Sequence, residues 1–114
     1  MAFIFMKKDL RIKKNEEFSE IISKNKSFSN ACYKIYRAKA KEKHSRVGIS
    51  VSKKIGNAVV RNKIKRQIRM MLIDLYDFDC SKYDLIIIVR NNYLKMAYKD
   101  CKNELELLIK KVII

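Results

Sequence analysis

The side chains that could take part in chemistry are concentrated in one basic stretch of the 114-residue sequence. From Lys43 to Ile73 there are nine Lys or Arg residues and no Asp or Glu. Because like charges repel, such a run on regular structure indicates an anionic partner. Arginine pairs with phosphate through two parallel N–H donors, and asparagine donates to phosphate or pairs with a base edge. The pattern favours nucleic-acid binding over a merely solvated basic face. One side of the expected helix would present Arg61, Asn62, Lys65, Arg66 and Arg69.

No set of residues in the sequence predicts catalysis or metal binding by the polypeptide itself. His44 is the only histidine, and no pair of cysteines has CxxC spacing. Three aspartates follow the basic stretch, but a helix end and a loop give no fixed ligand geometry, so we reject a metal site there. The glutamates near position 17 have a spacing that suits ion pairs with the basic residues before them. We therefore expect no catalytic residue and no metal ligand in this chain.

The composition indicates one folded domain, residues 1–114, with a polyanionic partner. The net charge is +15, the sequence pI is about 9.9, and 48% of the residues are hydrophobic. The odd number of cysteines favours buried thiols in a reducing cytoplasm. No apolar run reaches transmembrane length, and the apolar start lacks the features of a signal peptide. Residues 1–8 are expected to be a flexible arm, and Met6 is an alternative to Met1 as the native start.

The basic stretch reads as a strand, a turn and a helix. Residues 46–52 alternate between apolar and small side chains, as in a strand with one buried face. The small residues either leave room for a ligand across the sheet or pack under another element. Gly56 can take a left-handed conformation at no steric cost, and Asn57 is expected as the N-cap of a helix over 57–76. The apolar stripe of that helix comprises Val60, Ile64, Ile68, Met71, Leu72 and Leu75.

The remaining elements complete a small α/β (α+β) two-layer sandwich. Asn15 is expected to cap a first helix that ends near Asn25, and residues 27–41 form one long bent strand or two short ones. Residues 83–90 read as a central strand, and residues 95–113 as a last helix. The segments 46–52, 57–76 and 83–90 form a βαβ unit with parallel strands if these are neighbours, right-handed by the general rule.

Residues 46–69 closely resemble the signature of the protein subunit of bacterial ribonuclease P, and residues 10–18 resemble that family's first helix. The resemblance implies a subunit that binds a large catalytic RNA and helps it remove the 5′ leader of precursor tRNA. The RNA would perform the hydrolysis with Mg²⁺, held mainly by RNA and substrate, and no protein partner would be required. It also implies a fold like domain 2 of ribosomal protein S5, with a left-handed βαβ crossover.

The resemblance also assigns roles to individual residues. It places contacts to the RNA subunit at Lys53, Lys54, Arg61, Asn62, Lys63, Arg66 and Arg69. It places a leader-binding cleft at Phe18, Ile22, Lys34, Tyr36 and Lys65. Three of these depart from the family pattern: Lys63 stands for arginine, Ile22 for an aromatic residue, and Lys34 for an apolar one.

Three other classes of function are weighed against this interpretation. A structural or ribosomal RNA-binding protein without a processing role would have the same composition, and only the 46–69 block argues against it. An autonomous nuclease is disfavoured by the missing catalytic residues. A membrane-surface protein is disfavoured because the basic helix lacks a wide, bulky apolar face.

Overall fold

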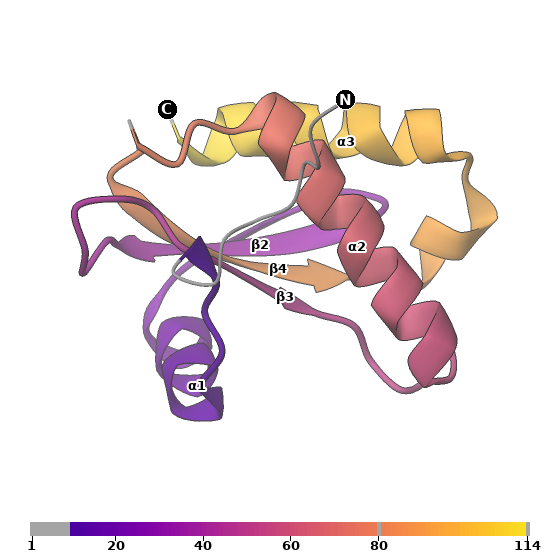
Figure 1. The fold of residues 1–114 in the computed structure, drawn as a ribbon, viewed down its shortest axis with the longest axis horizontal. Coiled ribbons are helices and arrows are strands. Elements are labelled where there is room, and N and C mark those ends of the chain that lie inside the picture. The colour runs from indigo at the N-terminus through magenta and orange to yellow at the C-terminus, as the bar shows by residue number, and fades with distance from the viewer. Residues whose placement is uncertain (1–9, 80, 114) are drawn as a thin grey trace, which may run out of the picture.

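The computed structural model describes residues 10–79 and 81–113, which form three α-helices and a sheet (Figure 1). The expected flexible arm, the choice between Met1 and Met6, and Cys80 lie outside these residues. The elements in order are α1 (Asn15–Lys24), β1 (Ser27–Ser29), β2 (Tyr33–Lys39), β3 (Val47–Ser50), α2 (Ala58–Leu75), β4 (Tyr83–Val89), the 3₁₀ helix η2 (Asn91–Lys95) and α3 (Tyr98–Val112). Within this part of the chain, no helix combines the length and apolarity needed to cross a bilayer.

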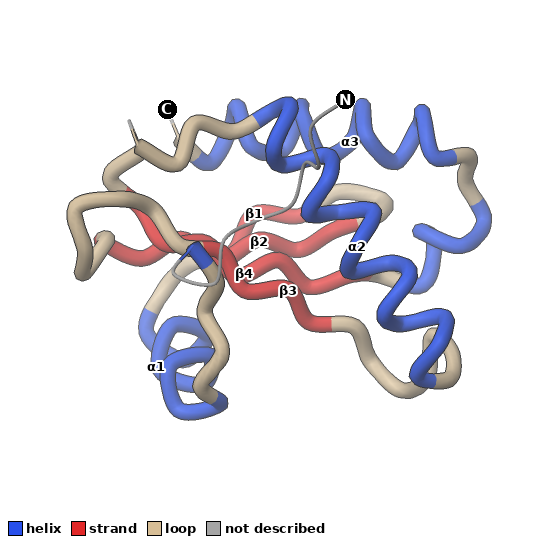
Figure 2. The backbone as a smooth tube through the Cα atoms, in the orientation of Figure 1, coloured by secondary structure: helices blue, strands red, loops and turns tan. Residues whose placement is uncertain are grey.

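The four strands form one mixed sheet in the order β1-β2-β4-β3 (Figure 2). β4 pairs antiparallel with β2 and parallel with β3, with Ile86 opposite both Tyr36 and Gly48. The parallel pairing confirms the predicted βαβ unit of β3, α2 and β4, and the α+β class is confirmed with it. The handedness of its crossover stays a prediction.

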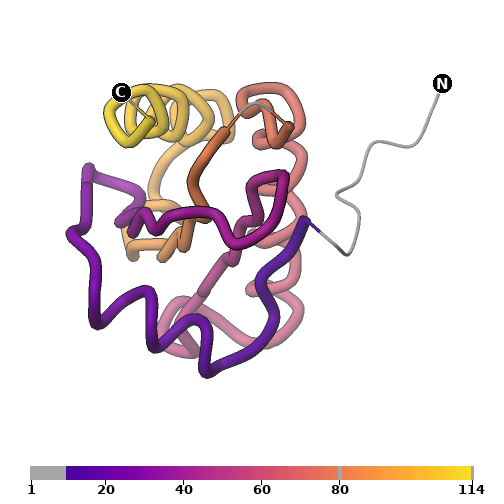
Figure 3. Tube along the Cα trace, turned by 90° about the vertical axis from the view of Figure 1, so that its left-hand side faces the viewer, coloured from indigo at the N-terminus to yellow at the C-terminus, as the bar shows by residue number. Residues whose placement is uncertain are grey.

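The helices lie on opposite faces of the sheet, with α2 and α3 on one face and α1 on the other (Figure 1). The view from the side shows the same separation of α1 from α3 (Figure 3). β4 is buried on both faces, because Leu85, Ile87 and Val89 pack in the larger core whereas Ile86 packs toward α1. The predicted stripe of α2 enters the larger core through its buried residues Ile64, Ile68, Met71 and Leu72.

The start of α2 confirms the predicted cap and gives a different reason for the glycine before it. Asn57 caps the helix, because its side-chain oxygen accepts from the backbone N–H of Val60 at 3.0 Å. Gly56 is not left-handed, since no described glycine has a positive φ. A Cβ on Gly56 would lie 2.8 Å from Cγ1 of Val60. The glycine is therefore required by the close approach of the capped first turn, and not by an unusual backbone.

Other boundaries differ from the sequence prediction by a few residues. Asn15 is the first residue of α1 and not its cap; the cap position belongs to Lys14, whose side chain makes no capping bond. Residues 27–41 form two strands, because the side-chain oxygen of Asn30 accepts from the N–H groups of Cys32 and Tyr33 and turns the chain. The expected helix over 95–113 begins only at Tyr98, after the separate η2.

Candidate nucleic-acid interface

An open groove of about 540 Å³ runs between α1 and α2, with β3 as its floor. Its lining includes four cationic side chains and no carboxylate. α1 supplies the aromatic ring of Phe18 and α2 the cations of Lys65 and Arg69. The groove therefore combines a stacking surface with phosphate-binding groups, as a site for single-stranded nucleic acid requires. Its lining residues are Arg11, Ile12, Lys13, Asn15, Phe18, Ser19, Ile22, Val47, Ile49, Ser50, Val51, Lys65 and Arg69.

The segment before α1 brings two of these cations to the groove. The N–H of Ile12 donates to the carbonyl of Val47 at 3.1 Å, and Arg11 forms a parallel bridge with the same residue. The sheet is thereby extended beyond β3, and Ile12 is buried against it. Burial lowers the pKa of Arg69, and the charge of Arg11 lowers it further. A bound phosphate would relieve this repulsion between the two guanidinium groups.

The small residues of β3 both pack under another element and leave space in the groove, the two alternatives that the sequence left open. A Cβ on Gly48 would lie only 2.5 Å from Cζ of Phe18, so this glycine makes room for α1 on the sheet. Ser50, two residues further along the same face, instead lines the groove. Gly48 thus sets how closely Phe18 approaches the sheet, and Ser50 leaves the neighbouring floor open.

Lys34 and Tyr36 do not line this groove. Both lie on β2, opposite Ile88 and Ile86 of β4, and β4 separates them from β3. The Nζ atom of Lys34 lies 5.4 Å from the centre of the Tyr36 ring. Tyr36 packs with Phe18 in the small cluster beneath α1. The structure therefore brings Phe18, Ile22 and Lys65 together and leaves Lys34 and Tyr36 on the adjoining part of the same sheet face.

Most of the residues expected to contact an RNA subunit lie outside the lining of the groove. Asn62, Lys63 and Arg66 are exposed on α2. Arg61 is half-buried, and its Nε atom is buried without a hydrogen-bond partner among the described residues. Lys53 and Lys54 are exposed in the turn before α2. Arg69 differs from these, because it lines the groove. Two cationic surfaces therefore share one helix.

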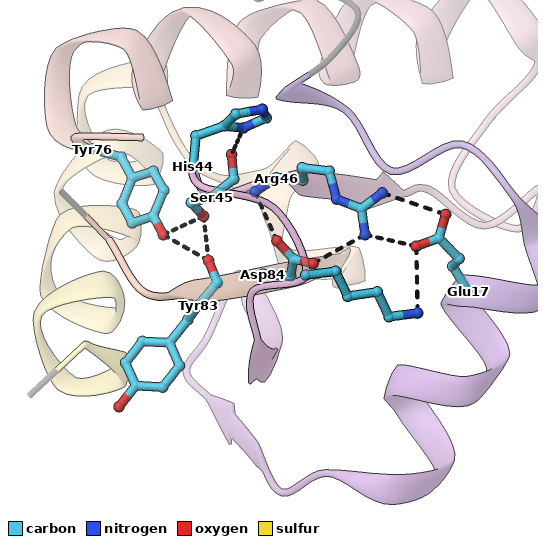
Figure 4. Close-up of polar contacts among 8 residues, drawn as sticks. Glu17, His44, Ser45, Arg46, Tyr76, Tyr83 and Asp84 are labelled. Atoms are coloured by element: carbon cyan, nitrogen blue, oxygen red, sulfur yellow. Dashed lines mark hydrogen bonds and ion pairs between the residues drawn. The ribbon is translucent and has the colours of Figure 1, made fainter. Parts of the chain in front are cut away.

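An ion-pair network that the sequence analysis missed ties α1 to the sheet (Figure 4). The Nη2 atom of Arg46 donates to Glu17 of α1 at 2.7 Å and to Asp84 of β4 at 3.0 Å. The hydrogen bond from Arg46 lowers the pKa of Glu17, with smaller effects from the charges of Lys41 and Lys14, and the same bond raises the pKa of Arg46. The main partner of Glu17 is thus Arg46, and not the preceding basic residues. Asp84 could have indicated this network from the sequence, because it lies within a strand predicted to be buried. A buried carboxylate requires a cationic or hydrogen-bonding partner.

The carboxylates, histidine and cysteines of the described residues do not gather in a group of three or more that could hold a metal ion. Asp74, one of the three aspartates considered for such a site, instead forms an ion pair with Lys102 at 2.8 Å.

Comparison with known proteins decides which polyanion-binding family this is. The family model described as Ribonuclease P matches residues 6–113. The chain belongs to the ribonuclease P family. A ribonuclease P protein component from Bacillus mycoides is 48% identical over 101 residues, which is 88% of each chain. That of Mycoplasma mycoides subsp. mycoides is 46% identical and covers 94% of this chain and 99% of its own.

Solved ribonuclease P proteins share the fold. The protein from Staphylococcus aureus has a TM-score of 0.80 at 40% identity, over 92% of this chain and 98% of its own. The protein from Thermotoga maritima has a TM-score of 0.76 at 25% identity, over 90% and 96%. The resemblance that was noted for residues 46–69 is thereby confirmed and extends over most of the chain. The chain is a subunit of an endoribonuclease and associates with ribonuclease P RNA.

Proposed function

We propose that this protein, a component of the endoribonuclease ribonuclease P, binds the 5′ leader of precursor tRNA in the groove between α1 and α2. The exposed side chains of α2 that lie outside the groove lining bind the catalytic RNA subunit at the same time. Removal of the leader then leaves the mature 5′ end of the tRNA. We place this work in the cytoplasm, in keeping with the free, buried thiols of Cys32 and Cys101.

The observation that carries the proposal is the position of Lys65 and Arg69. Both lie on α2 and line the groove opposite Phe18. One base of a single strand can stack on Phe18 while its phosphates contact the cations across the groove. Double-stranded RNA would not enter in this way, because its bases are already stacked on each other. The groove therefore selects for an unpaired leader over the folded body of a tRNA.

Each group of side chains has a separate task in this proposal. The outer cations of α2 hold the RNA subunit through phosphate contacts, and Asn62 adds a hydrogen-bond donor among them. The groove cations offset part of the substrate's charge, which reduces the concentration of Mg²⁺ needed for assembly. Mg²⁺ held by the RNA and the substrate would activate the attacking water. The protein orients the leader and contributes no catalytic side chain.

The first experiment measures leader cleavage by a bacterial ribonuclease P RNA at low Mg²⁺, with and without this protein. We expect cleavage to be stimulated only when protein and RNA are both present. Tight RNA binding without stimulation would instead indicate a structural RNA-binding protein. Cleavage by the protein alone would refute the assignment of catalysis to the RNA.

A matched pair of variants then separates the two surfaces of α2. Lys65→Gln removes a groove cation, whereas Lys63→Gln removes an exposed cation two residues away. We expect Lys65→Gln to weaken precursor binding about fivefold and to leave mature tRNA binding within about twofold. Lys63→Gln should weaken affinity for the RNA subunit and change precursor and mature tRNA binding equally. Equal effects of Lys65→Gln on both tRNAs would refute the leader groove.

A further inference from the structure

The α1 wall of the groove has few attachments of its own. α1 has ten residues and no side-chain N-cap. Ile21 is its single fully buried residue, and Phe18 and Ile22 are half-buried. An isolated helix of this length is unstable in water, so tertiary contacts must determine where it lies. Its apolar side chains hold it against the sheet, but such contacts are not directional as a hydrogen bond is.

Arg46 supplies a directional attachment that these apolar contacts lack. Asp84 is 1% exposed and belongs to the central strand, so its carboxylate is held in place. It accepts from the backbone N–H of Arg46 at 2.9 Å and from the Nη2 atom of the same residue at 3.0 Å. The guanidinium is therefore oriented by the sheet before it meets α1. Its Nη1 and Nη2 atoms then donate to the two carboxylate oxygens of Glu17, at 3.4 and 2.7 Å.

The attachment point lies beside the groove and outside its lining. Glu17 does not line the groove, but its neighbours Phe18 and Ser19 do. The side chain of Arg46 likewise has no place in the lining, whereas the next residue, Val47, forms part of the floor. A bidentate guanidinium–carboxylate pair restricts both distance and angle. The pair therefore joins the α1 wall of the groove to its β3 floor. It does so through Glu17 and Arg46, each of which directly precedes a residue of the lining.

We propose that Arg46 is a positioning residue for leader recognition, which holds Glu17 so that Phe18 lies at the correct height over the floor of the groove. This inference rests on the proposed leader groove. Asp84 holds Arg46, Arg46 holds Glu17, and Glu17 holds the helical turn that carries Phe18. Neither Arg46 nor Glu17 needs to contact the leader.

Glu17→Gln is the sharpest test, because it loosens only the α1 end of the network. The contact between Arg46 and the buried Asp84 remains, and no buried charge loses its partner. Glu16→Gln is the matched control, since it removes the same charge from an adjacent, exposed residue. Both variants change the long-range attraction for RNA to nearly the same extent. A difference between them therefore reports the contacts of Glu17, chiefly that with Arg46 at 2.7 Å and also the longer one with Lys41 at 4.0 Å.

We expect Glu17→Gln to weaken precursor binding about fivefold relative to Glu16→Gln, because small misplacements of binding groups have large effects. Affinity for mature tRNA and for the RNA subunit should stay within about twofold of the control. Hydrogen exchange should become faster in the backbone amides of α1 and stay unchanged in those of α3. Arg46→Lys keeps the charge but loses the paired N–H donors of the guanidinium. It should reproduce the loss of precursor affinity, and circular dichroism should show that the chain remains folded.

The wild-type chain separates failure of this inference from failure of the proposed function. If wild-type protein binds precursor and mature tRNA equally well, the leader groove itself is refuted. If the wild type prefers the precursor and Glu17→Gln keeps that preference at the level of Glu16→Gln, only the positioning role is overturned. An equal loss of precursor, mature tRNA and RNA-subunit binding in Glu17→Gln would also overturn it, since that would show general destabilisation.

Discussion

Replacing Gly48 with alanine should push the ring of Phe18 away from the floor of the groove. The new Cβ would lie 2.5 Å from Cζ of Phe18 and 2.9 Å from Cδ1 of Ile86. Carbon atoms in ordinary contact are about 3.5–4.0 Å apart, so one neighbour must retreat by roughly 1 Å. Ile86 is fully buried in the central strand, whereas Phe18 is half-exposed. We therefore expect Phe18 to move, and α1 with it.

The cost of this movement can be bounded. Adding a methyl group to a well-packed site usually costs about 1–3 kcal/mol. Because Phe18 can move toward solvent, we expect a value near the lower end, about 1 kcal/mol. With a urea m-value of about 2 kcal/mol/M for a small domain, the unfolding midpoint should fall by roughly 0.5 M. Urea unfolding followed by far-UV circular dichroism measures this change.

A double-mutant cycle identifies the source of the cost. In a Phe18→Ala background the ring is absent, so Gly48→Ala should destabilise the protein less than it does in the wild type. Precursor binding by Gly48→Ala should weaken, with mature tRNA binding unchanged. The reasoning is refuted if Gly48→Ala leaves the unfolding midpoint and precursor affinity unchanged, or if the two substitutions prove additive.

Three further outcomes are expected. Arg66→Ala should reduce the slope of the logarithm of the RNA-subunit binding constant against the logarithm of the salt concentration by about 0.7–0.9, because one phosphate contact is lost. Lys99→Ala on α3 should leave this slope unchanged. Equal slopes for the two variants would show that Arg66 is not in the interface. The lowered pKa of Glu17 means that its contribution to stability is complete above the ordinary value of 4.5 and is lost as the pH falls through the lowered value. Glu17→Gln should therefore unfold at more similar urea concentrations at pH 7 and pH 3 than the wild type does; an unchanged difference would contradict this. Burial raises the pKa of Cys101 to about 12 and also raises that of Cys32. Iodoacetamide at pH 8 should therefore modify both thiols only after unfolding, which peptide mass spectrometry would measure. Rapid modification of either residue in the folded chain would contradict their burial.

The elements that the sequence predicted well are those in which local pattern and tertiary packing agree. The apolar stripe of α2 recurs at helical spacing, and Asn57 has a local capping role, so both could be predicted from nearby residues. The buried run of β4 likewise identified the central strand. Gly56 shows where this reasoning fails, because glycine is compatible with a left-handed turn and equally with a close side-chain approach. Only the position of Val60 distinguishes the two.

The groove could be predicted only in part, because its residues come from distant segments. Family resemblance named Phe18 and Lys65, which the structure places across the groove from each other. It also named Tyr36, which lies on β2 and outside the groove, because β4 separates β2 from the β3 floor. The order of strands in a sheet cannot be predicted from neighbouring residues. The Arg46 network was missed for the same reason. Its partners are 29 and 38 residues away, and no local spacing rule connects them.

The strand order also determines when the domain can form during synthesis. β4 lies between β2 and β3, so these two earlier strands have no direct pairing with each other. The sheet cannot close until the ribosome has passed Val89, and α1, although made first, has no complete surface to dock on before then. Long-range pairing of this kind delays folding. The nascent chain therefore carries its basic stretch, residues 43–73, without a defined groove until β4 has been made.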